Sequence, residues 1–532
     1  MKTPCLAARS PRLHPARLCL SYEKYMETSY DTVVMGGSLA GAATALLLKR
    51  RVPAMRILII EKSEEFDRKV GESTSEVSAC FLTRVLGLTK YLGHHQLSKQ
   101  GLRMWFSKSP EGNFTDCSEI GPKYQGRLPT FQLDRQKLDQ HVLEEAVAAG
   151  VELLRPAKIR KFALSPGQNR LELDSEIPHT IHAKWLVDAS GRVAMIGRKL
   201  GLLEPMTEQP TASIWGRFQN VNDWDSMDMK ETESSFSDVC RTQRTWATNH
   251  LTGLGWWCWI IPLKGGDFSV GIVYDKRIFT LPSGPTLGDR LKAHLLTHPI
   301  GKMLFENATP VAGDMKACSQ LPFRQKYIAA DGWFMVGDAA GFMDPMYSPG
   351  LDLISYSAMN AVDLIARAFQ GEDITDAVAH YNERWEDNFR KWFAGVYKNK
   401  YYYIGDAELM ATAFMLDVSL YFLGPVRQAY SNIKDRYTSP PYGGVPGDIV
   451  AAFMRTYNRR LVAIAKKRIA AGTYGAMNEN WRELFPGFSP DTSVLPLMRR
   501  AILRWIRLEL GSLFLKPKQE MAVTPLGEPS AV

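Results

Sequence analysis

The sequence predicts an α/β fold: a parallel-sheet domain split along the chain, an antiparallel β-sheet inserted into it, and a helical C-terminal region. Three observations predict this fold. A glycine-rich turn, Gly36–Gly41, separates a short apolar strand from a helix-forming segment. A second apolar strand enters Gly337-Asp338 and another helix about 300 residues later. Short strand patterns fill the sequence between them, and helix formers and aromatic residues dominate beyond about residue 375.

The composition is that of a globular, soluble protein of two to four domains. The chain has 532 residues, of which 45% are hydrophobic and 23% are charged. Asp417 and Pro425 interrupt its most apolar stretch, Leu409–Val426, so no transmembrane segment is expected. The net charge of +9 is too modest for a dedicated nucleic-acid-binding protein. It suits an anionic cofactor, an acidic partner or an anionic membrane surface, which leaves peripheral membrane contact open.

Cysteine usage indicates a reducing compartment, which we take to be the cytoplasm. The seven cysteines are scattered and form no CxxC pair, so no structural metal site is expected. Residues 1–29 contain arginines but no continuous apolar core, which argues against a secretory signal. We expect a disordered tail or an assigned start that is too early, since Met26 lies just before the first strand. An organellar transit peptide is the alternative.

The expected domain boundaries follow the changes of pattern. The parallel-sheet domain comprises residues 31–200 and 320–372, with an inserted β-rich substrate domain at 201–319. Residues 375–515 form the helical region and residues 516–532 a loose tail. The expected strands are 32–35, 56–60, a hairpin of 102–106 with 109–113, 152–155, 158–164, 170–173, 185–187, 214–220, 255–263, 268–274 and 333–336; the expected helices are 42–50, 75–86, 137–149 and 352–369.

The first turn has the chemistry of a Rossmann-like dinucleotide-binding site. A glycine at position 36 permits a sharp exit from the strand, and a glycine at position 41 lets the helix approach the sheet closely. The helix N-terminus then offers free N–H groups to a pyrophosphate. Glu61, 20 residues after the last glycine, can accept hydrogen bonds from a ribose. The predicted contacts are Gly36, Gly37, Ser38 (where glycine is usual), Ala40, Gly41 and Glu61; the alternative is a glycine-rich turn without a ligand.

The second turn indicates that the dinucleotide is FAD. A strand that ends in Gly337-Asp338 puts an acid beside a polyol chain and a helix N-terminus beside a flavin carbonyl. No second glycine turn follows a strand, so electrons must come from a separate flavin reductase or a transient NAD(P)H donor. Further predicted FAD contacts are Glu72, Ser73, Thr74, Arg135 and Asp188; as alternatives, Ser73-Thr74 is a helix cap and Arg135 is solvated.

Six motifs carry a family resemblance. The turn GGSLAG, the stretch Asp188–Arg192 and the segment GDAAG resemble the p-hydroxybenzoate-hydroxylase class of FAD monooxygenases. Three more are similar to the flavin-dependent halogenase branch, whose members are tryptophan-halogenase-like. They are Gly71-Glu72-Ser73-Thr74, Trp257-Cys258-Trp259-Ile260-Ile261-Pro262 (a WxWxIP motif) and Asp344-Pro345-Met346-Tyr347-Ser348-Pro349-Gly350 (a DPxxSxG segment). The resemblance covers roughly residues 31–370.

The resemblance implies an oxidative halogenation. In this family reduced FAD (FADH2) and O2 give a C4a-hydroperoxide, bound halide converts it to hypohalous acid, and a lysine delivers the halogen to an electron-rich aromatic ring. Lys99, in Ser98-Lys99-Gln100-Gly101, is similar to that lysine in phenol- and pyrrole-type members. A lysine can hydrogen-bond hypohalous acid or form a haloamine. The alternative is a surface lysine, and Lys69 and Lys90 are weaker candidates.

The same resemblance assigns the remaining site residues. Trp257 and Trp259 share one face of a strand and are expected to separate flavin from substrate, with Cys258 pointing away. Tyr347 replaces the glutamate of tryptophan halogenases, which favours a phenol or pyrrole over free tryptophan. Pro349 has no N–H, which removes one plausible donor to chloride or bromide. The segment is expected to contact FAD through Pro345, Gly350 and Leu351, and halide through Ser348 and Gly350.

Three alternatives stay open. The enzyme could be an FAD-dependent monooxygenase or oxidase that uses no halide. The protein could also be a non-catalytic flavoprotein scaffold, which is not an enzyme. The aromatic substrate could be carried on an acidic carrier protein that docks on Arg499, Arg500 and Arg504; these arginines could equally form a solvated basic face.

Overall fold

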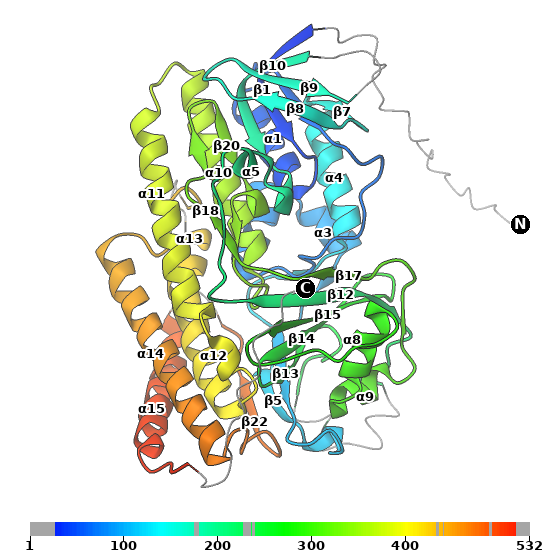
Figure 1. The fold of residues 1–532 in the computed structure, drawn as a ribbon, viewed down its shortest axis with the longest axis vertical. Helices are drawn as coiled ribbons and strands as arrows, with labels where there is room; N and C mark the ends of the chain where they lie inside the picture. The colour runs from blue at the N-terminus through cyan, green and yellow to red at the C-terminus, as the bar shows by residue number, and fades with distance from the viewer. Residues whose placement is uncertain are drawn as a thin grey trace, which may run out of the picture.

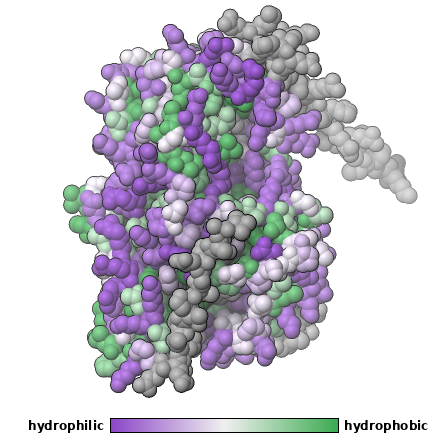
Figure 2. All heavy atoms as spheres, viewed as in Figure 1, coloured by the Kyte–Doolittle hydropathy of each residue, from purple (hydrophilic) through white to green (hydrophobic). Residues whose placement is uncertain are grey.

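The structure, a computed structural model, describes residues 27–174, 180–226, 236, 240–431, 436–439, 441–488 and 492–517. Most of both predicted tails, 1–29 and 516–532, therefore lies outside the described residues. Figure 1 shows a parallel sheet with its helices in the upper part, an inserted sheet at the lower right and C-terminal helices along the left. In Figure 2 most of the visible surface is hydrophilic, and apolar side chains gather at the lower left.

The upper part is built on a parallel sheet, which confirms the predicted α/β fold. Its central strands follow the order β20-β10-β1-β2-β7, and all are parallel to their neighbours. Helix α1 packs against α4 and α10. The strands of this sheet are β1 (Glu27–Met35), β2 (Ile57–Ile60), β7 (Glu152–Leu154), β8 (Ile159–Ala163), β9 (Asn169–Leu173), β10 (Thr180–Asp188), β19 (Ala329–Ala330) and β20 (Trp333–Met335); the helices are α1 (Leu39–Arg51), α4 (Arg135–Ala148) and α10 (Pro349–Phe369).

The inserted sheet has nine strands, and its edges extend beyond the predicted insertion. Its order is β16-β12-β15-β14-β13-β4-β5-β22, with β17 also paired to β12. Strands β4 and β5 come from the predicted first segment of the parallel-sheet domain, and β22 from the predicted helical region. The strands are β4 (Leu102–Phe106), β5 (Ser118–Pro122), β12 (Thr211–Gln219), β13 (Thr248–Gly253), β14 (Trp256–Pro262), β15 (Phe268–Asp275), β16 (Thr309–Pro310), β17 (Lys316–Cys318) and β22 (Arg482–Phe485).

One predicted strand is wrong. The hairpin partner of β4 is β5, not residues 109–113. The chain turns at 109–112, where Gly112 N–H donates to the Ser109 carbonyl at 3.2 Å, because Pro110 and Gly112 favour a turn. The smaller elements are β3 (Leu97–Ser98), β6 (Phe131–Gln132), β11 (Leu203–Pro205), β18 (Phe323–Gln325), β21 (Gly341–Phe342), α2 (Glu76–Cys80), α3 (Thr89–His95), α5 (Met195–Lys199), α8 (Leu287–Leu295) and α9 (Pro299–Phe305).

The C-terminal helices form a bundle against both sheets. One segment, Ala407–Tyr430, is apolar and long enough to cross a membrane, but 78% of its most apolar window is buried inside the protein. This segment also carries Asp417 in a buried ion pair, so it serves as a core helix. The helices are α11 (Thr375–Trp392), α12 (Ala407–Tyr421), α13 (Arg427–Tyr430), α14 (Gly444–Ala471) and α15 (Leu495–Ser512).

The strand register brings the predicted turns to one edge of the parallel sheet. Met35, the last residue of β1, pairs with Ile60 and with Asp188, and Asp188 pairs with Met335. The turns that follow β1, β10 and β20 therefore leave the sheet side by side. In doubly wound folds this carboxyl edge is where ligands bind.

Candidate functional site

The glycine turn between β1 and α1 is a tight cradle. Gly36 has φ +110°, a left-handed conformation that favours glycine. A Cβ atom at Gly41 would lie 1.9 Å from the Gly36 carbonyl oxygen, so no larger residue fits there. The turn feeds directly into α1, whose first N–H groups have no partners within the helix. The residues present therefore fit a dinucleotide pyrophosphate at this helix N-terminus.

Glu61 and Lys69 flank this cradle. The Glu61 carboxylate accepts hydrogen bonds from Gly37 N–H at 2.8 Å and Ser63 N–H at 2.9 Å, which fixes it at the end of β2. The Lys69 ammonium donates to the Ser38 hydroxyl, so a cation lies beside the helix N-terminus. Burial lowers the pKa of Lys69 from its ordinary value. The sequence offered no signal that Lys69 belongs to the anion-binding turn, because it lies in a loop that returns there only in the fold.

The second predicted segment lies against the first. A Cβ at Gly337 would lie 3.0 Å from the Ala40 Cβ, so the two turns meet although about 300 residues separate them. Asp338 is half-buried, and within the described residues its carboxylate has no hydrogen-bond partner. Burial raises its pKa, while the nearby cations Arg192 and Arg135 act in the opposite direction. An unpartnered acid here fits the hydroxyls of the flavin polyol chain.

Two residues predicted to contact FAD, Arg135 and Asp188, also have partners within the protein. The Arg135 guanidinium binds both carboxylate oxygens of Asp139, at 2.8 and 3.2 Å, and donates to the Val70 carbonyl at 3.1 Å. Both Asp188 oxygens are used within its own turn, by Ser190 N–H at 3.0 Å and by Ile196 N–H at 2.7 Å. Arg135 therefore orders the loop before position 72, and Asp188 caps a turn. Sequence alone does not reveal such local partners.

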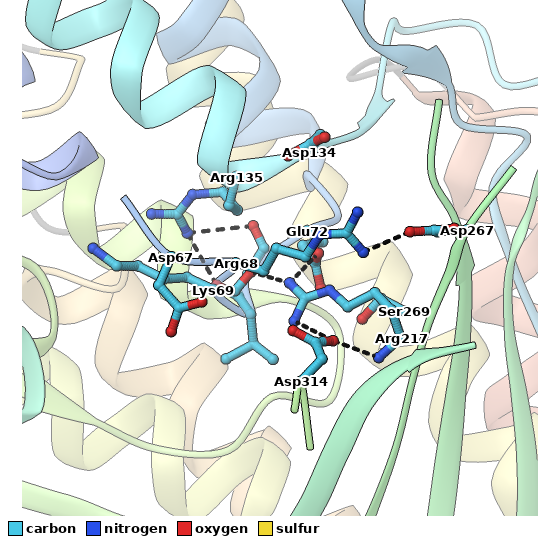
Figure 3. A network of polar contacts seen from close by, with 12 residues as sticks. Asp67, Arg68, Lys69, Glu72, Asp134, Arg135, Arg217, Asp267, Ser269 and Asp314 are labelled. Atoms are coloured by element: carbon cyan, nitrogen blue, oxygen red, sulfur yellow. Dashed lines mark hydrogen bonds and ion pairs between the residues drawn. The ribbon is translucent and has the colours of Figure 1, made fainter. Parts of the chain in front are cut away.

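Three ion pairs hold the loop 67–72 to the inserted sheet, and Figure 3 shows those of Arg68 and Glu72. Asp67 pairs with Lys316, Arg68 pairs with Asp267 at 2.5 Å, and Glu72 pairs with Arg217 at 2.5 Å. Desolvation raises the pKa of the fully buried Glu72 to about 7, although Arg217 lowers it. The Glu72 side chain thus faces the inserted sheet, and Glu72 can line a flavin only through its backbone.

Thr74 connects this loop to the candidate lysine. The Lys99 ammonium donates to the Thr74 carbonyl at 2.8 Å. Lys99 is half-buried, and desolvation lowers its pKa to about 8, whereas the charges of Glu76 and Asp352 raise it. Ser73, the neighbouring predicted contact, exchanges a hydrogen bond with the Thr248 hydroxyl at 2.9 Å. A half-buried lysine whose pKa is lowered toward neutral pH is a candidate for a catalytic role.

The other two lysines are placed elsewhere. Lys90 is exposed on α3, and Lys69 lies at the first turn beside Ser38. Only Lys99 of the three lies against the 71–74 loop on the side of Asp352. Asp352 belongs to the first turn of α10, and it accepts hydrogen bonds from Ser78 N–H at 3.1 Å and from the Tyr421 hydroxyl at 2.9 Å. Burial raises its pKa to about 7.

The two tryptophans of β14 lie on one face of the strand, as predicted. Their ring centroids are 5.9 Å apart, and Cys258 packs in the separate core on the opposite face. Trp257 Nε1–H donates to the Tyr401 hydroxyl at 3.0 Å, and that hydroxyl donates to Asp344 at 2.8 Å. Trp259 Nε1–H donates to the Ser269 hydroxyl at 3.1 Å. Both rings are buried, so these contacts fix a rigid wall between the sheet and the 344–350 turn.

The 344–350 turn is sharply bent and ends at the N-terminus of α10. Tyr347 and Ser348 both have left-handed φ angles, +67° and +60°. Ser348 N–H donates to the Pro345 carbonyl at 3.0 Å, so only its hydroxyl remains for a halide. Pro349 takes the first helical position, where a missing N–H breaks no helical hydrogen bond. Gly350 is half-buried and Leu351 buried, and their N–H groups are the helix-end donors that remain.

Tyr347 is anchored by a buried cluster that the sequence did not reveal. Its hydroxyl lies 3.2 Å from Asp417 Oδ2 and 3.3 Å from the Lys400 ammonium. Lys400 and Asp417 form a buried ion pair at 2.6 Å, and Tyr457 donates to the other Asp417 oxygen. Burial, reinforced by Asp417, raises the pKa of Tyr347 well above its ordinary value, so the phenol stays neutral.

Two sets of groups therefore meet at the 71–76 segment. One set, around Gly36, Glu61 and Asp338, fits FAD. The other contains Lys99, Glu76 and the 344–350 turn, and it offers one amine, acids and helix-end N–H groups beside an aromatic wall.

Comparisons with known proteins find relatives among the flavin-dependent halogenases. The family model described as tryptophan halogenase matches residues 95–398. The flavin-dependent halogenase chlA of Dictyostelium discoideum is 26% identical over 434 residues, which cover 74% of this chain and 69% of that protein. A 1H-pyrrole-2-carbonyl-[peptidyl-carrier protein] chlorinase of Pseudomonas fluorescens is also 26% identical, over 73% of this chain and 86% of its own.

A solved structure has the same fold. Halogenase PltM in complex with phloroglucinol and FAD superposes with a TM-score of 0.71 at 15% identity, over 90% of this chain and 98% of its own.

Proposed function

The chain belongs to the tryptophan halogenase family, and from this premise we propose that it halogenates an electron-rich aromatic ring with chloride or bromide, using reduced FAD and O2. The observation that carries the proposal is the placement of Lys99. Its ammonium is half-buried and bound to the Thr74 carbonyl, at the junction between the FAD-binding turns and the 344–350 turn. Reduced FAD, when bound, would activate O2, which is the oxidant that converts halide to hypohalous acid.

The protein's own groups would then guide the halogen. Gly350 N–H and the Ser348 hydroxyl, at the positive end of α10, hold the halide. Lys99 donates a hydrogen bond to hypohalous acid and orients it toward the ring. The buried faces of Trp257 and Trp259 exclude water, which would otherwise carry the acid away.

The substrate we propose is a phenol or pyrrole. Tyr347 places an uncharged aromatic ring where a glutamate would pair with a free amino acid. One relative acts on a pyrrole bound to a carrier protein, and one structural neighbour binds phloroglucinol, which support both ring types. We also propose that a separate reductase or NAD(P)H supplies the electrons, and that the enzyme works in the cytoplasm.

Docking of an acidic carrier is less well supported. Of the three predicted docking arginines, Arg500 and Arg504 both pair with Glu483 at 2.6 Å. Arg499 is exposed. A carrier would therefore meet less free positive charge on this helix than the sequence implies.

The alternative is an FAD-dependent oxygenation without halide. Pro349 has no N–H and Ser348 has already donated its own, so two of the backbone donors of this turn are unavailable to an anion. This observation keeps the monooxygenase function in consideration.

Halide dependence separates the two functions. We would reduce the FAD-bound protein anaerobically, mix it with O2 and phloroglucinol, and measure products by mass spectrometry at increasing bromide and chloride. Halogenated product that rises to saturation with halide is expected. Hydroxylated product in a yield that does not depend on halide would contradict halogenation. If phloroglucinol stays unreacted while oxidant is released with a saturable dependence on halide, only the proposed substrate would change.

Glu76 provides a pH test of the role of Lys99. The pKa of Lys99 is about 8, so its ammonium predominates at neutral pH and is lost as pH rises through that value. If the ammonium holds hypohalous acid, halogenation should fall above about pH 8. Glu76 raises this pKa, so Glu76→Gln should move the fall to lower pH.

The measurement is a pH–rate profile of halogenation at saturating reduced flavin, with exposed Glu111→Gln as the matched control. A rate that rises through the same pH range would show instead that the neutral amine reacts, as haloamine formation requires.

A further inference from the structure

The outer face of α15 carries an apolar stripe that the rest of the described chain does not cover. Leu503, Ile506 and Leu510 are 48%, 48% and 57% exposed. They recur at helical spacing of three and four residues, so they share one face. The stripe continues past the helix end through Leu513 and Phe514, which are 69% and 82% exposed. Figure 2 shows apolar side chains at the lower left, where Figure 1 places α14 and α15.

Cations border the stripe, and they have no acidic partners among the described residues. Arg499 lies one turn before Leu503 on the same face, and Arg507 lies between Ile506 and Leu510 along its side; both are exposed. Lys516, beyond the helix end, is exposed as well. The one acid on α15, Glu509, is turned toward α14 and pairs with Arg460. The outer face is therefore apolar and positive.

The opposite face of α15 is fixed to the protein. Leu497, Ala501 and Leu508 are buried in the core, and Arg500 and Arg504 bind Glu483. Trp505 packs against Phe453 of α14 with ring centroids 6.0 Å apart. The helix is thus held rigidly with its apolar stripe outward, so binding a surface would cost little conformational entropy.

We propose that α15 docks the enzyme on an anionic lipid surface. Exposed leucine, isoleucine and phenylalanine side chains flanked by arginine and lysine are the pattern of helices that lie in a membrane interface. The apolar side chains would enter the boundary of the acyl chains, and Arg499, Arg507 and Lys516 would meet lipid phosphates. A second copy of the chain fits less well, because it would bring the same exposed cations together.

The test is co-sedimentation of the full chain with vesicles of phosphatidylglycerol and phosphatidylcholine, and with phosphatidylcholine alone. We expect binding to the anionic vesicles, weakened by salt, and little binding to the neutral ones. The variant Leu503→Gln/Ile506→Gln/Leu510→Gln should lose at least about tenfold in partitioning. Arg499→Gln/Arg507→Gln should lose roughly fivefold per arginine on anionic vesicles only.

Controls separate docking from unfolding and from self-association. Lys108→Gln/Lys326→Gln, which removes two exposed lysines in loops outside α15, should bind as the parent does. Unfolding temperature and FAD binding should be unchanged in the α15 variants. Absence of binding to anionic vesicles would overturn the proposal. So would a dimer in sedimentation velocity that the leucine variant converts to a monomer while vesicle binding persists.

Discussion

Replacing Lys99 by alanine is expected to lower the rate of halogenated product formation by at least about 100-fold, the usual range for loss of a positioned proton-donating group. Reoxidation of reduced flavin by O2 should proceed as before, because Lys99 contacts the Thr74 carbonyl and not the glycine turns. Product is measured by mass spectrometry, and flavin reoxidation by absorbance in the same reaction.

Lys90→Ala is the matched control, since Lys90 is an exposed lysine nearby in sequence. Its product yield should equal that of the parent. The free energy of unfolding of the Lys99→Ala protein should lie within about 1.5 kcal/mol of the parent's, because the variant loses one partly exposed hydrogen bond. Undiminished halogenation by Lys99→Ala would show that hypohalous acid reacts without this lysine. Retained hydroxylation with no halogenation in either protein would support the oxygenase alternative.

The parts of the site that the sequence predicted well are those made by local backbone. The Gly36–Gly41 turn is recognisable because the close approach of Gly41 to the Gly36 carbonyl leaves no room for a side chain. Burial of all four residues of β2 likewise follows from a continuous apolar run. Sequence alone could place the two cofactor turns together, because parallel strands end at a common edge.

The parts it missed depend on the choice of side-chain partners. Arg135 was predicted to contact FAD, but its ion pair with Asp139, one helical turn away, was not predicted. A local motif does not indicate whether a guanidinium will bind a neighbouring carboxylate, a ligand or both.

Strand β22 was missed, because the sequence predicts only helices in the C-terminal region. Its four residues give too short a pattern, and its partner β5 lies some 360 residues earlier in the chain.

The buried cluster around Tyr347 is a second case in which the sequence did not reveal the partners of a side chain. Tyr347 and Asp417 are separated by 70 residues, and Asp417 lies in a stretch apolar enough to pass for a membrane span. Sequence treats that aspartate as an interruption of the apolar run. In the fold it is the centre of the contacts that hold Tyr347, so polar residues within an apolar helix were the signal that could have found it.

Asp417→Asn is expected to cause the largest loss of stability, about 3–5 kcal/mol in the free energy of unfolding. Lys400 is only 2% exposed, and the substitution would leave its ammonium buried without a counter-charge. The Tyr457 and Tyr347 hydroxyls would lose a charged acceptor as well. Urea unfolding followed by tryptophan fluorescence measures the change, and Glu383→Gln, an acid 80% exposed on α11, should leave stability within about 0.5 kcal/mol.

The double variant Asp417→Asn/Lys400→Met distinguishes an uncompensated charge from simple loss of packing. Removing the ammonium together with its partner eliminates the buried charge, so the double variant should be more stable than Asp417→Asn alone. A double variant as unstable as the sum of the two single variants would show that the pair is not coupled. The same pair fixes Tyr347, whose ring we propose faces the substrate. The double variant should therefore also halogenate with a raised KM and a less changed kcat, because this ring is loosened while Lys99 stays in place.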